Sequence, residues 1–206
     1  MADGILTVVS GPAGSGKGTV LAHVLDSDSD FLYSVSATTR PIRPGELDGV
    51  NYFFISRQDF EARIKSGGML EYTEYVGNYY GTPRDFVEKS LAKGKNVLLE
   101  IEVDGAFQIK RLFPSAVLIF LCPPNIAVLE ERLKGRNTET PQVIRRRLEK
   151  AVSEIKRAPD YDYIVTNEEG KASEAAKDIL AITRAEKLRS ARRAGEMEER
   201  FFGIKK

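Results

Sequence analysis

Four runs of apolar residues divide the chain, and each has the continuous character of a strand that is buried on both faces. They span residues 5–10 (ILTVVS), 96–102 (NVLLEIE), 116–122 (AVLIFLC) and, as a shorter run, 163–166 (YIVT). Strands of this kind belong to parallel sheets, whose two faces are both covered by helices. The pattern therefore predicts a parallel sheet at the centre of the protein.

Between these runs the apolar residues recur every three or four positions, which is the spacing of one face of a helix. Strands that alternate with helices predict an α/β fold in which helices flank a parallel core sheet. The helical patterns cover residues 17–25, 104–112, 126–133 and 141–156, and a last helix is expected from about Lys171.

The middle of the chain has a different pattern. From residue 33 to residue 94, short alternating stretches are separated by Gly and Pro, which predicts a small, mostly antiparallel subdomain with two helices. We expect this subdomain to be inserted between the first and second core strands, so that the core comprises residues 1–32 and 95–206. The last dozen residues are expected to form a charged tail, whose Phe201–Phe202 pair docks on the body, docks on a partner, or stays free.

Composition narrows the classes of function. Lys and Arg number 31 against 30 Asp and Glu, so the net charge is +1; we expect neither nucleic acid nor a membrane as a partner, and any anion site must be local. The single cysteine, Cys122, and the single histidine, His23, exclude an internal disulfide and a histidine metal cluster. We expect Cys122 in the core and His23 in a structural or surface position. The chain has no secretory start and no apolar run near the ~20 residues of a membrane span, which predicts a cytoplasmic protein.

The clearest chemical motif directly follows the first predicted strand. Residues 11–17 fit the pattern G-x-x-x-x-G-K and open a predicted helix, so backbone N–H groups and the helix N-terminus can form a nest for phosphate oxygens, with Lys17 reaching the terminal phosphates. The motif predicts ATP, bound with Mg²⁺. The Ser or Thr that usually follows the lysine and binds the metal is Gly18 here, so Mg²⁺ must depend more on water, phosphates and an acidic residue elsewhere. The expected ATP-binding residues of the loop are Gly11, Pro12, Ala13, Gly14, Ser15, Gly16, Lys17, Gly18 and Thr19.

A second phosphate site is indicated by residues 38–55 (TTRPIRPGELDGVNYFFI), where Arg40, Arg43 and Tyr52 lie in a stretch stiffened by Pro and Gly. The planar guanidinium of arginine binds phosphate through two parallel hydrogen bonds. The segment resembles the signature of guanylate kinases at every defined position. Similar matches at residues 34–36, 77–82, 132–136 and 138–140 extend the resemblance over nearly the whole chain, and to the bacterial type of guanylate kinase in particular.

The resemblance implies an enzyme with a P-loop core, an inserted subdomain that binds GMP, and a small lid at about residues 134–146. It implies the reaction ATP + GMP = ADP + GDP. It also implies that the phosphate of GMP is held by Arg40, Arg43, Tyr52 and Tyr80, and that guanine is read by Ser36, Glu71 and Thr82.

Glu71 suits this role chemically, because guanine presents N1–H and N2–H₂ side by side and a carboxylate can accept from both. Adenine would leave that carboxylate unpaired, at a cost of ~1.5–3 kcal/mol or more. The alternative is that Glu71 is a solvated strand residue like neighbouring Glu74.

The segment from residue 130 to residue 157 carries nine Lys or Arg and five Glu. Such a charge run is most often a solvated helix face. By similarity, Arg132, Arg136 and Arg147 close over the phosphates of ATP, and Asn167 lies near the adenine, whereas Arg145 and Arg146 are expected at the surface.

Because the acceptor oxygen of a phosphate is already anionic, no general base is required. The residues expected to act in catalysis are Lys17, Arg40, Arg43, Arg136 and Arg147. Either Glu100 or Glu102, at the end of a core strand, could hold Mg²⁺ through water, or could instead order Arg40 or Arg43 through a salt bridge. Two other functions remain open: a kinase for another nucleoside monophosphate, and a non-catalytic scaffold domain of the same shape. Whether the chain forms a homo-oligomer also stays open.

Overall fold

The computed structural model describes residues 4–135 and 141–203, and a five-stranded parallel sheet lies at its centre. The order across the sheet is β2-β7-β1-β8-β9, and every neighbouring pair is parallel. This confirms the predicted α/β class. The strands are β1 (Leu6–Ser10), β2 (Phe31–Tyr33), β7 (Asn96–Glu100), β8 (Val117–Cys122) and β9 (Tyr163–Thr166).

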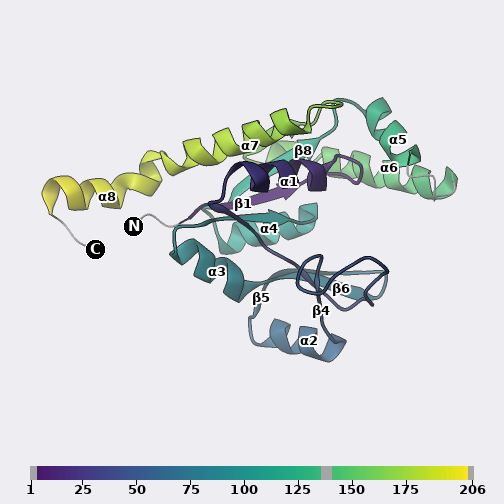
Figure 1. Ribbon diagram of the computed structural model, residues 1–206, viewed down its shortest axis with the longest axis horizontal. Helices are drawn as coiled ribbons and strands as arrows, with labels where there is room; N and C mark the ends of the chain where they lie inside the picture. Colours follow the sequence, from purple (N-terminus) through teal and green to yellow (C-terminus); the bar gives the residue numbers. More distant parts are fainter. Residues whose placement is uncertain (1–3, 136–140, 204–206) are drawn as a thin grey trace.

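Both faces of the sheet are covered, because successive strand residues point to opposite sides. Val9 and Ile119 face α1 and α7, whereas Val8 and Phe120 face α3 and α4. Figure 1 shows these two helical layers on either side of β1. The helices are α1 (Lys17–Ser27), α3 (Arg84–Ala92), α4 (Val103–Leu112) and α7 (Ala172–Lys187).

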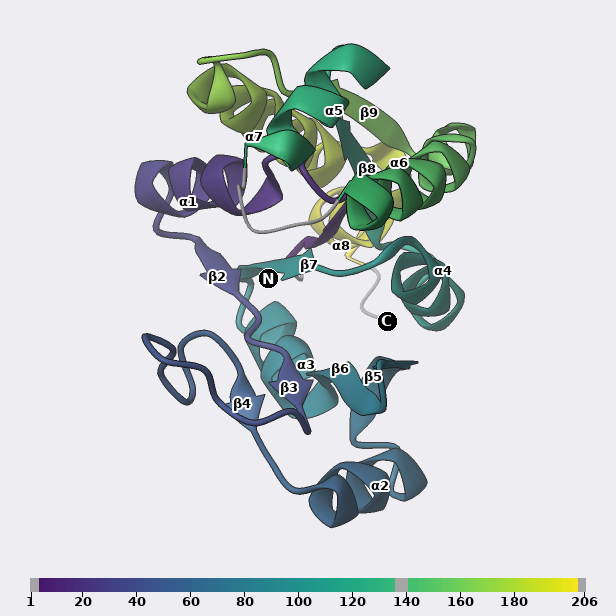
Figure 2. The same ribbon diagram turned by 90° about the vertical axis from the view of Figure 1, so that its right-hand side faces the viewer.

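A second, four-stranded sheet in the order β4-β3-β6-β5 forms a separate lobe with α2 (Figure 2). Its β3–β6 and β5–β6 pairs are antiparallel and its β3–β4 pair is parallel, so the lobe is mostly antiparallel, as expected. Ala37, Phe60 and Met69 form its small core. The elements are β3 (Ala37–Thr38), β4 (Phe53–Phe54), α2 (Arg57–Lys65), β5 (Met69–Tyr75) and β6 (Asn78–Pro83).

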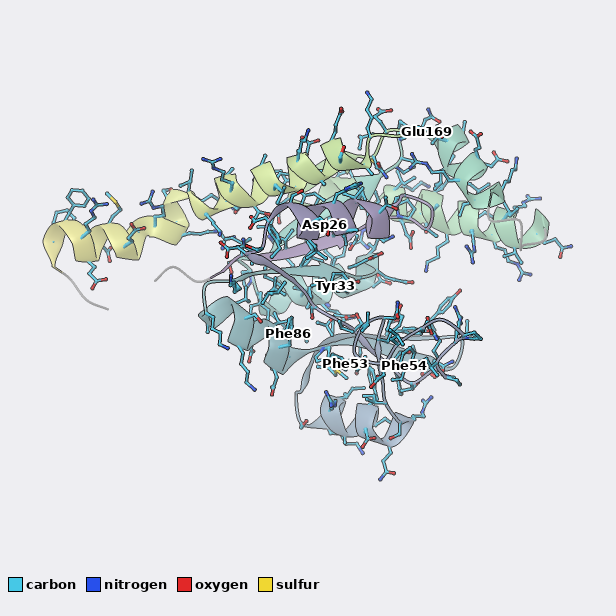
Figure 3. All side chains as sticks on the ribbon, in the orientation of Figure 1. Asp26, Tyr33, Phe53, Phe54, Phe86 and Glu169 are labelled. Atoms are coloured by element: carbon cyan, nitrogen blue, oxygen red, sulfur yellow. The ribbon has the colours of Figure 1, made fainter. Side chains whose placement is uncertain are left out.

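One expectation about the insertion is wrong. The second lobe does not follow the first core strand, because β2 precedes it and pairs with β7 at the edge of the main sheet. Tyr33, where the insertion was expected to begin, is the last residue of β2 and lies between the two sheets (Figure 3). A strand of three residues that pairs on one side only is too short to produce a periodic pattern.

Helices α5 (Ile126–Lys134) and α6 (Pro141–Ile155) pack against each other around Leu129, Leu133 and Ala151, and Ile155 at the end of α6 joins this cluster to a core of the main sheet. A short 3₁₀ helix, η1 (Ala158–Asp160), leads from them to β9. The residues expected to form a charged tail fall largely in α8 (Ser190–Phe202), which extends beyond α7 in Figure 1. Phe201 and Phe202 remain 63% and 74% exposed, so the pair does not dock on the body. Within residues 4–135 and 141–203, no helix has the length and apolar character required to cross a membrane.

Candidate active site

The loop between β1 and α1 has the backbone shape of an anion nest. Gly16 is the N-cap of α1 with φ +85°, a left-handed conformation that favours glycine, and a Cβ there would lie 2.4 Å from Nδ2 of Asn167. At Gly11 a Cβ would lie 2.0 Å from the carbonyl oxygen of Leu121. Glycine is therefore required at both positions, because Leu121 of β8 and Asn167, directly after β9, approach the loop closely. The loop ends at the N-terminus of α1, where backbone N–H groups without partners in the helix can bind an anion.

Lys17 is the first residue of α1, and its ammonium is held back over the loop. Nζ donates hydrogen bonds to the carbonyl oxygens of Gly11 at 2.7 Å and Pro12 at 3.3 Å. It borders a pocket of about 320 Å³ between the two lobes. The other residues that line this first pocket are Gly11, Ala13, Tyr33, Ser36, Asn51, Tyr52, Glu100, Ile101, Glu102, Arg147, Lys150 and Glu154.

Three acids, Glu100, Glu102 and Glu154, lie in the wall of the first pocket, and the first two are the expected candidates for Mg²⁺. Burial raises the pKa of Glu100, while the positive charge of Lys17 and a hydrogen bond from Tyr33 oppose that rise. Glu102 accepts a hydrogen bond of 3.0 Å from Nζ of Lys150. Neither of these two candidates orders Arg40, which pairs with Glu46 instead.

Arg40 is fixed and almost completely buried, with 8% of the residue exposed. Its guanidinium donates to both carboxylate oxygens of Glu46, at 2.5 and 2.7 Å, and lies 5.2 Å from the centre of the Tyr52 ring. The hydrogen bond from Arg40 is the main reason why the pKa of Glu46 falls to about 2. Tyr80 packs edge-on against Tyr52, so the guanidinium and two phenols lie together.

Arg43 differs from Arg40, although the sequence suggested an equivalent pair. Its side chain is exposed, and only its backbone N–H donates to Glu46, at 2.9 Å. The same carboxylate therefore holds the Arg40 guanidinium and the turn that carries Arg43. This makes Glu46 a positioning residue that sequence reasoning did not single out, although it lies in the matched segment.

Glu71 is buried, unlike its neighbour Glu74. It lies on β5 opposite Thr82 of β6, and the Thr82 hydroxyl donates a hydrogen bond of 2.7 Å to Oε1. Only 5% of Glu71 is exposed, whereas the Glu74 side chain is 48% exposed, so the interpretation of Glu71 as a solvated strand residue is wrong. Burial raises its pKa to about 7. A carboxylate that is shielded from water and oriented by a hydrogen bond to one of its oxygens is suited to recognising the hydrogen-bond donors of a ligand.

A second pocket of about 590 Å³ lies on the other side of the loop and is lined by Gly16, Thr19, His23, Arg132 and Asn167, among others. Asn167 links the loop to the end of β9. Its side-chain Nδ2 donates to the Ser15 carbonyl at 2.8 Å, and its backbone carbonyl accepts a hydrogen bond of 3.0 Å from the Arg132 guanidinium. Asn167 Oδ1 and Arg132 Nη1 are buried without a hydrogen-bond partner among the described residues. Such atoms are available to a ligand.

The arginines of α5 and α6 are divided between the pockets. Arg147 lines the first pocket and Arg132 the second, while Arg145 and Arg146 are exposed, as expected. Arg136 and the following residues of the expected lid up to residue 140 lie outside the described residues. Sequence reasoning missed Lys150 and Glu154, which lie three and seven residues after Arg147 and therefore share its helix face.

Comparison with known proteins gives a consistent result. A family model described as guanylate kinase matches residues 4–183. The guanylate kinase of Lactiplantibacillus plantarum is 53% identical over 95% of this chain and 95% of its own length, and that of Thermus thermophilus is 52% identical over 95% and 87%. The crystal structure of guanylate kinase from Anaplasma phagocytophilum, 33% identical, has a TM-score of 0.78 and covers 100% of this chain and 98% of that one. The chain therefore belongs to the guanylate kinase family.

Proposed function

We propose that the two lobes and the first pocket between them bring ATP and GMP together for phosphoryl transfer. The chain is an enzyme, a nucleoside monophosphate kinase that transfers the γ-phosphoryl group of ATP to GMP and forms ADP and GDP. The observation that carries the assignment of the site is that one pocket is lined by Gly11 and Lys17 of the phosphate loop and by Ser36 and Tyr52 of the second lobe. The buried Arg40 guanidinium lies 5.2 Å from the centre of that Tyr52 ring.

On the acceptor side, Arg40, Arg43, Tyr52 and Tyr80 hold the phosphate of GMP. Ser36, Glu71 and Thr82 read the guanine, whose N1–H and N2–H₂ would donate to the Glu71 carboxylate. The bond from Thr82 supports this assignment, because it orients the carboxylate and occupies only one lone pair of Oε1, so that acceptor sites remain on the carboxylate for the base. GMP binding requires Glu71 ionised, since a protonated carboxyl cannot accept from both donors.

On the donor side, the loop from Gly11 to Thr19 wraps the phosphates of ATP, and Lys17 moves from the loop carbonyls to the transferred group. Arg147 faces the same pocket, and Arg136 is proposed to join it. Arg132 and Asn167, with their unpartnered buried atoms, border the second pocket, which suits the adenosine. Two sites on either side of one loop place the terminal phosphate toward the acceptor.

Catalysis then requires alignment and neutralisation of charge, because the attacking phosphate oxygen is already anionic. Lys17, Arg40, Arg43, Arg136 and Arg147 supply the positive charge. Closing the two lobes around the substrates would exclude water, which limits wasteful hydrolysis of ATP.

Mg²⁺ is the cofactor that we propose to enter with ATP. Of the two candidate acids, Glu100 fits better, because it lies in the first pocket beside Lys17, whereas Glu102 is engaged by Lys150. The described residues form no cluster of three or more metal-binding side chains, which suits an ion bound mainly through phosphates and water. When bound, the metal supplies neutralisation of phosphate charge.

The proposal extends to the organisation of the chain. The GMP-binding lobe lies within residues 33–94, although Tyr33 of β2 and helix α3 at the two ends of this range pack with the main sheet. The core otherwise comprises residues 1–32 and 95–206, and a lid lies at about residues 134–146. A cytoplasmic location, with ATP and GMP rather than nucleic acid or membrane as partners, is proposed with it.

A coupled assay of ADP formation with ATP, Mg²⁺ and each of AMP, GMP, CMP and UMP tests the assignment. We expect turnover with GMP to exceed turnover with the other three. Preference for another monophosphate would indicate a different kinase, and nucleotide binding without turnover would indicate a scaffold; the comparisons favour neither alternative.

A further inference from the structure

Lys150 contacts three parts of the molecule at once. Its Nζ lies 3.0 Å from Oε2 of Glu102 at the start of α4, 3.6 Å from Oε1 of Glu154 on its own helix, and 5.6 Å from the centre of the Tyr75 ring at the end of β5. One side chain thus joins α6, the core and the second lobe.

This position matters because α6 packs against the core of the main sheet at its last residue, Ile155, while its preceding turns pack against α5. Helices α5 and α6 share a small core of their own, around Leu129, Leu133 and Ala151, whereas Val103 and Ile109 of α4 belong to a core of the main sheet. Helix α6 also carries Arg147, one turn before Lys150 and in the same pocket. A bridge from Lys150 to α4 therefore sets where Arg147 lies relative to the loop.

The other end of the bridge leads to the guanine-reading acid. Glu102 is the N-cap of α4, and Gly105 lies in the first turn of the same helix. A Cβ at Gly105 would lie 2.8 Å from Oε2 of Glu71, so the Glu71 carboxylate packs directly on this turn. The contacts Glu71–Gly105 and Glu102–Lys150 thus connect the proposed guanine site to the helix of Arg147 through a single turn of α4.

We propose that Lys150 is a positioning residue that couples the two nucleotide sites. Because of this coupling, GMP binds more tightly to the enzyme that already holds ATP than to the free enzyme, and ATP binds more tightly to the enzyme that already holds GMP. The inference rests on the function proposed above. GMP fixes Glu71 against the first turn of α4, Glu102 on that turn holds Lys150, and Lys150 holds Arg147 toward the phosphates of ATP. By linkage, the coupling factor is the same in both directions.

A merely structural role predicts a different result. The side chains of Lys150 and Glu102 are 50% and 57% exposed, and an ion pair of that exposure adds little to stability. Loss of the pair should therefore hardly change the melting temperature, while the ratio of nucleotide affinities should change.

Isothermal titration calorimetry of the full chain measures this ratio, as the GMP dissociation constant without and with a saturating non-hydrolysable ATP analogue and Mg²⁺. We expect the analogue to tighten GMP binding in the wild type, and Lys150→Met to reduce that factor by about two- to fivefold, the range of one exposed ion pair. Glu102→Gln should lose the same factor, and the double variant should lose no more than either single variant. Lys150→Arg should keep the coupling.

Arg145→Met is the matched control, because Arg145 pairs with Glu149 on the exposed face of the same helix. It should leave the coupling factor at the wild-type value. The inference is overturned if the wild type shows no coupling, if Lys150→Met keeps it, or if Arg145→Met loses as much. If the wild type binds neither nucleotide, the proposed function fails as well, so the two failures are distinguishable.

Discussion

The donor loop and the acceptor lobe are both proposed to bind phosphate, but they are built differently. The loop is a contiguous stretch, residues 11–17, whose glycines let backbone N–H groups form the cradle, with one ammonium added by Lys17. The acceptor site uses side chains from separate segments, with Arg40 before the turn at Glu46, Glu71 on β5, and Tyr80 and Thr82 on β6.

The difference teaches which changes each site tolerates. A backbone cradle is sensitive where a Cβ would collide, as at Gly16, and depends on few side chains. A side-chain site depends on every charged or hydrogen-bonding group and on the sheet that holds them in register. Substitution of the single lysine should therefore abolish most of the activity of the donor site, whereas each substitution in the acceptor site should remove only part of the selectivity for GMP.

The largest effect is expected for Lys17→Ala. This substitution removes the only side-chain cation of the loop, and loss of one group that stabilises transition-state charge lowers kcat by about 10²- to 10³-fold. Steady-state ADP formation with saturating ATP and GMP measures it. Lys89→Ala, which removes an exposed lysine of α3 paired with Asp85, is the control and should keep wild-type kcat. Equal losses in both variants would contradict the role of Lys17.

Glu71→Gln should come next, because it replaces an acceptor of two hydrogen bonds by a group that offers a donor in place of one acceptor. We expect kcat/KM for GMP to fall by roughly 10- to 100-fold, the range for an unpaired hydrogen bond to a charged group. ATP affinity, measured by calorimetry, should be unchanged. Glu74→Gln on the same strand is the matched control, and an unchanged kcat/KM in the Glu71 variant would remove Glu71 from the guanine site.

A smaller effect is expected for Asn167→Ala on the donor side. The substitution removes the hydrogen bond from Nδ2 to the Ser15 carbonyl and leaves the backbone contact with Arg132 in place. Loss of one such bond should raise KM for ATP by about two- to tenfold. KM for GMP, determined in the same assay, should not move; a parallel rise in both constants would mean that Asn167 supports the whole fold rather than the donor site.

The last prediction concerns stability rather than activity, through the proton on Glu71. Because burial raises its pKa from 4.5 to about 7, the folded protein keeps a proton that the unfolded chain releases between these pH values. The protonated carboxyl therefore adds to the free energy of unfolding at low pH, and this added stability is lost as pH rises from 4.5 through about 7. Glu71→Gln does not titrate, so in urea unfolding of the ligand-free protein the variant should gain stability relative to wild type between about pH 5 and about pH 8. No change in that difference would show that Glu71 does not titrate in this range.

The core strands and the phosphate loop could be predicted because their signals are local. Each apolar run is a continuous stretch, and the loop motif ends where α1 begins, so neighbours in sequence determine both. The short edge strand β2 gave no such signal, since it pairs only with β7, more than sixty residues later. The position of the insertion was therefore misjudged by one strand.

The residue types of the site were visible in the sequence, but their environments were decided by tertiary structure. Arg40 and Arg43 look equivalent in the chain, yet one is buried against Glu46 and the other is exposed. Glu71 and Glu74 lie on one strand, yet only Glu71 is enclosed by β6 and α4. Burial and the contact of Lys150 with Glu102 depend on elements that are distant in sequence and adjacent in space, and periodicity along one segment carries no information about which segment lies opposite it.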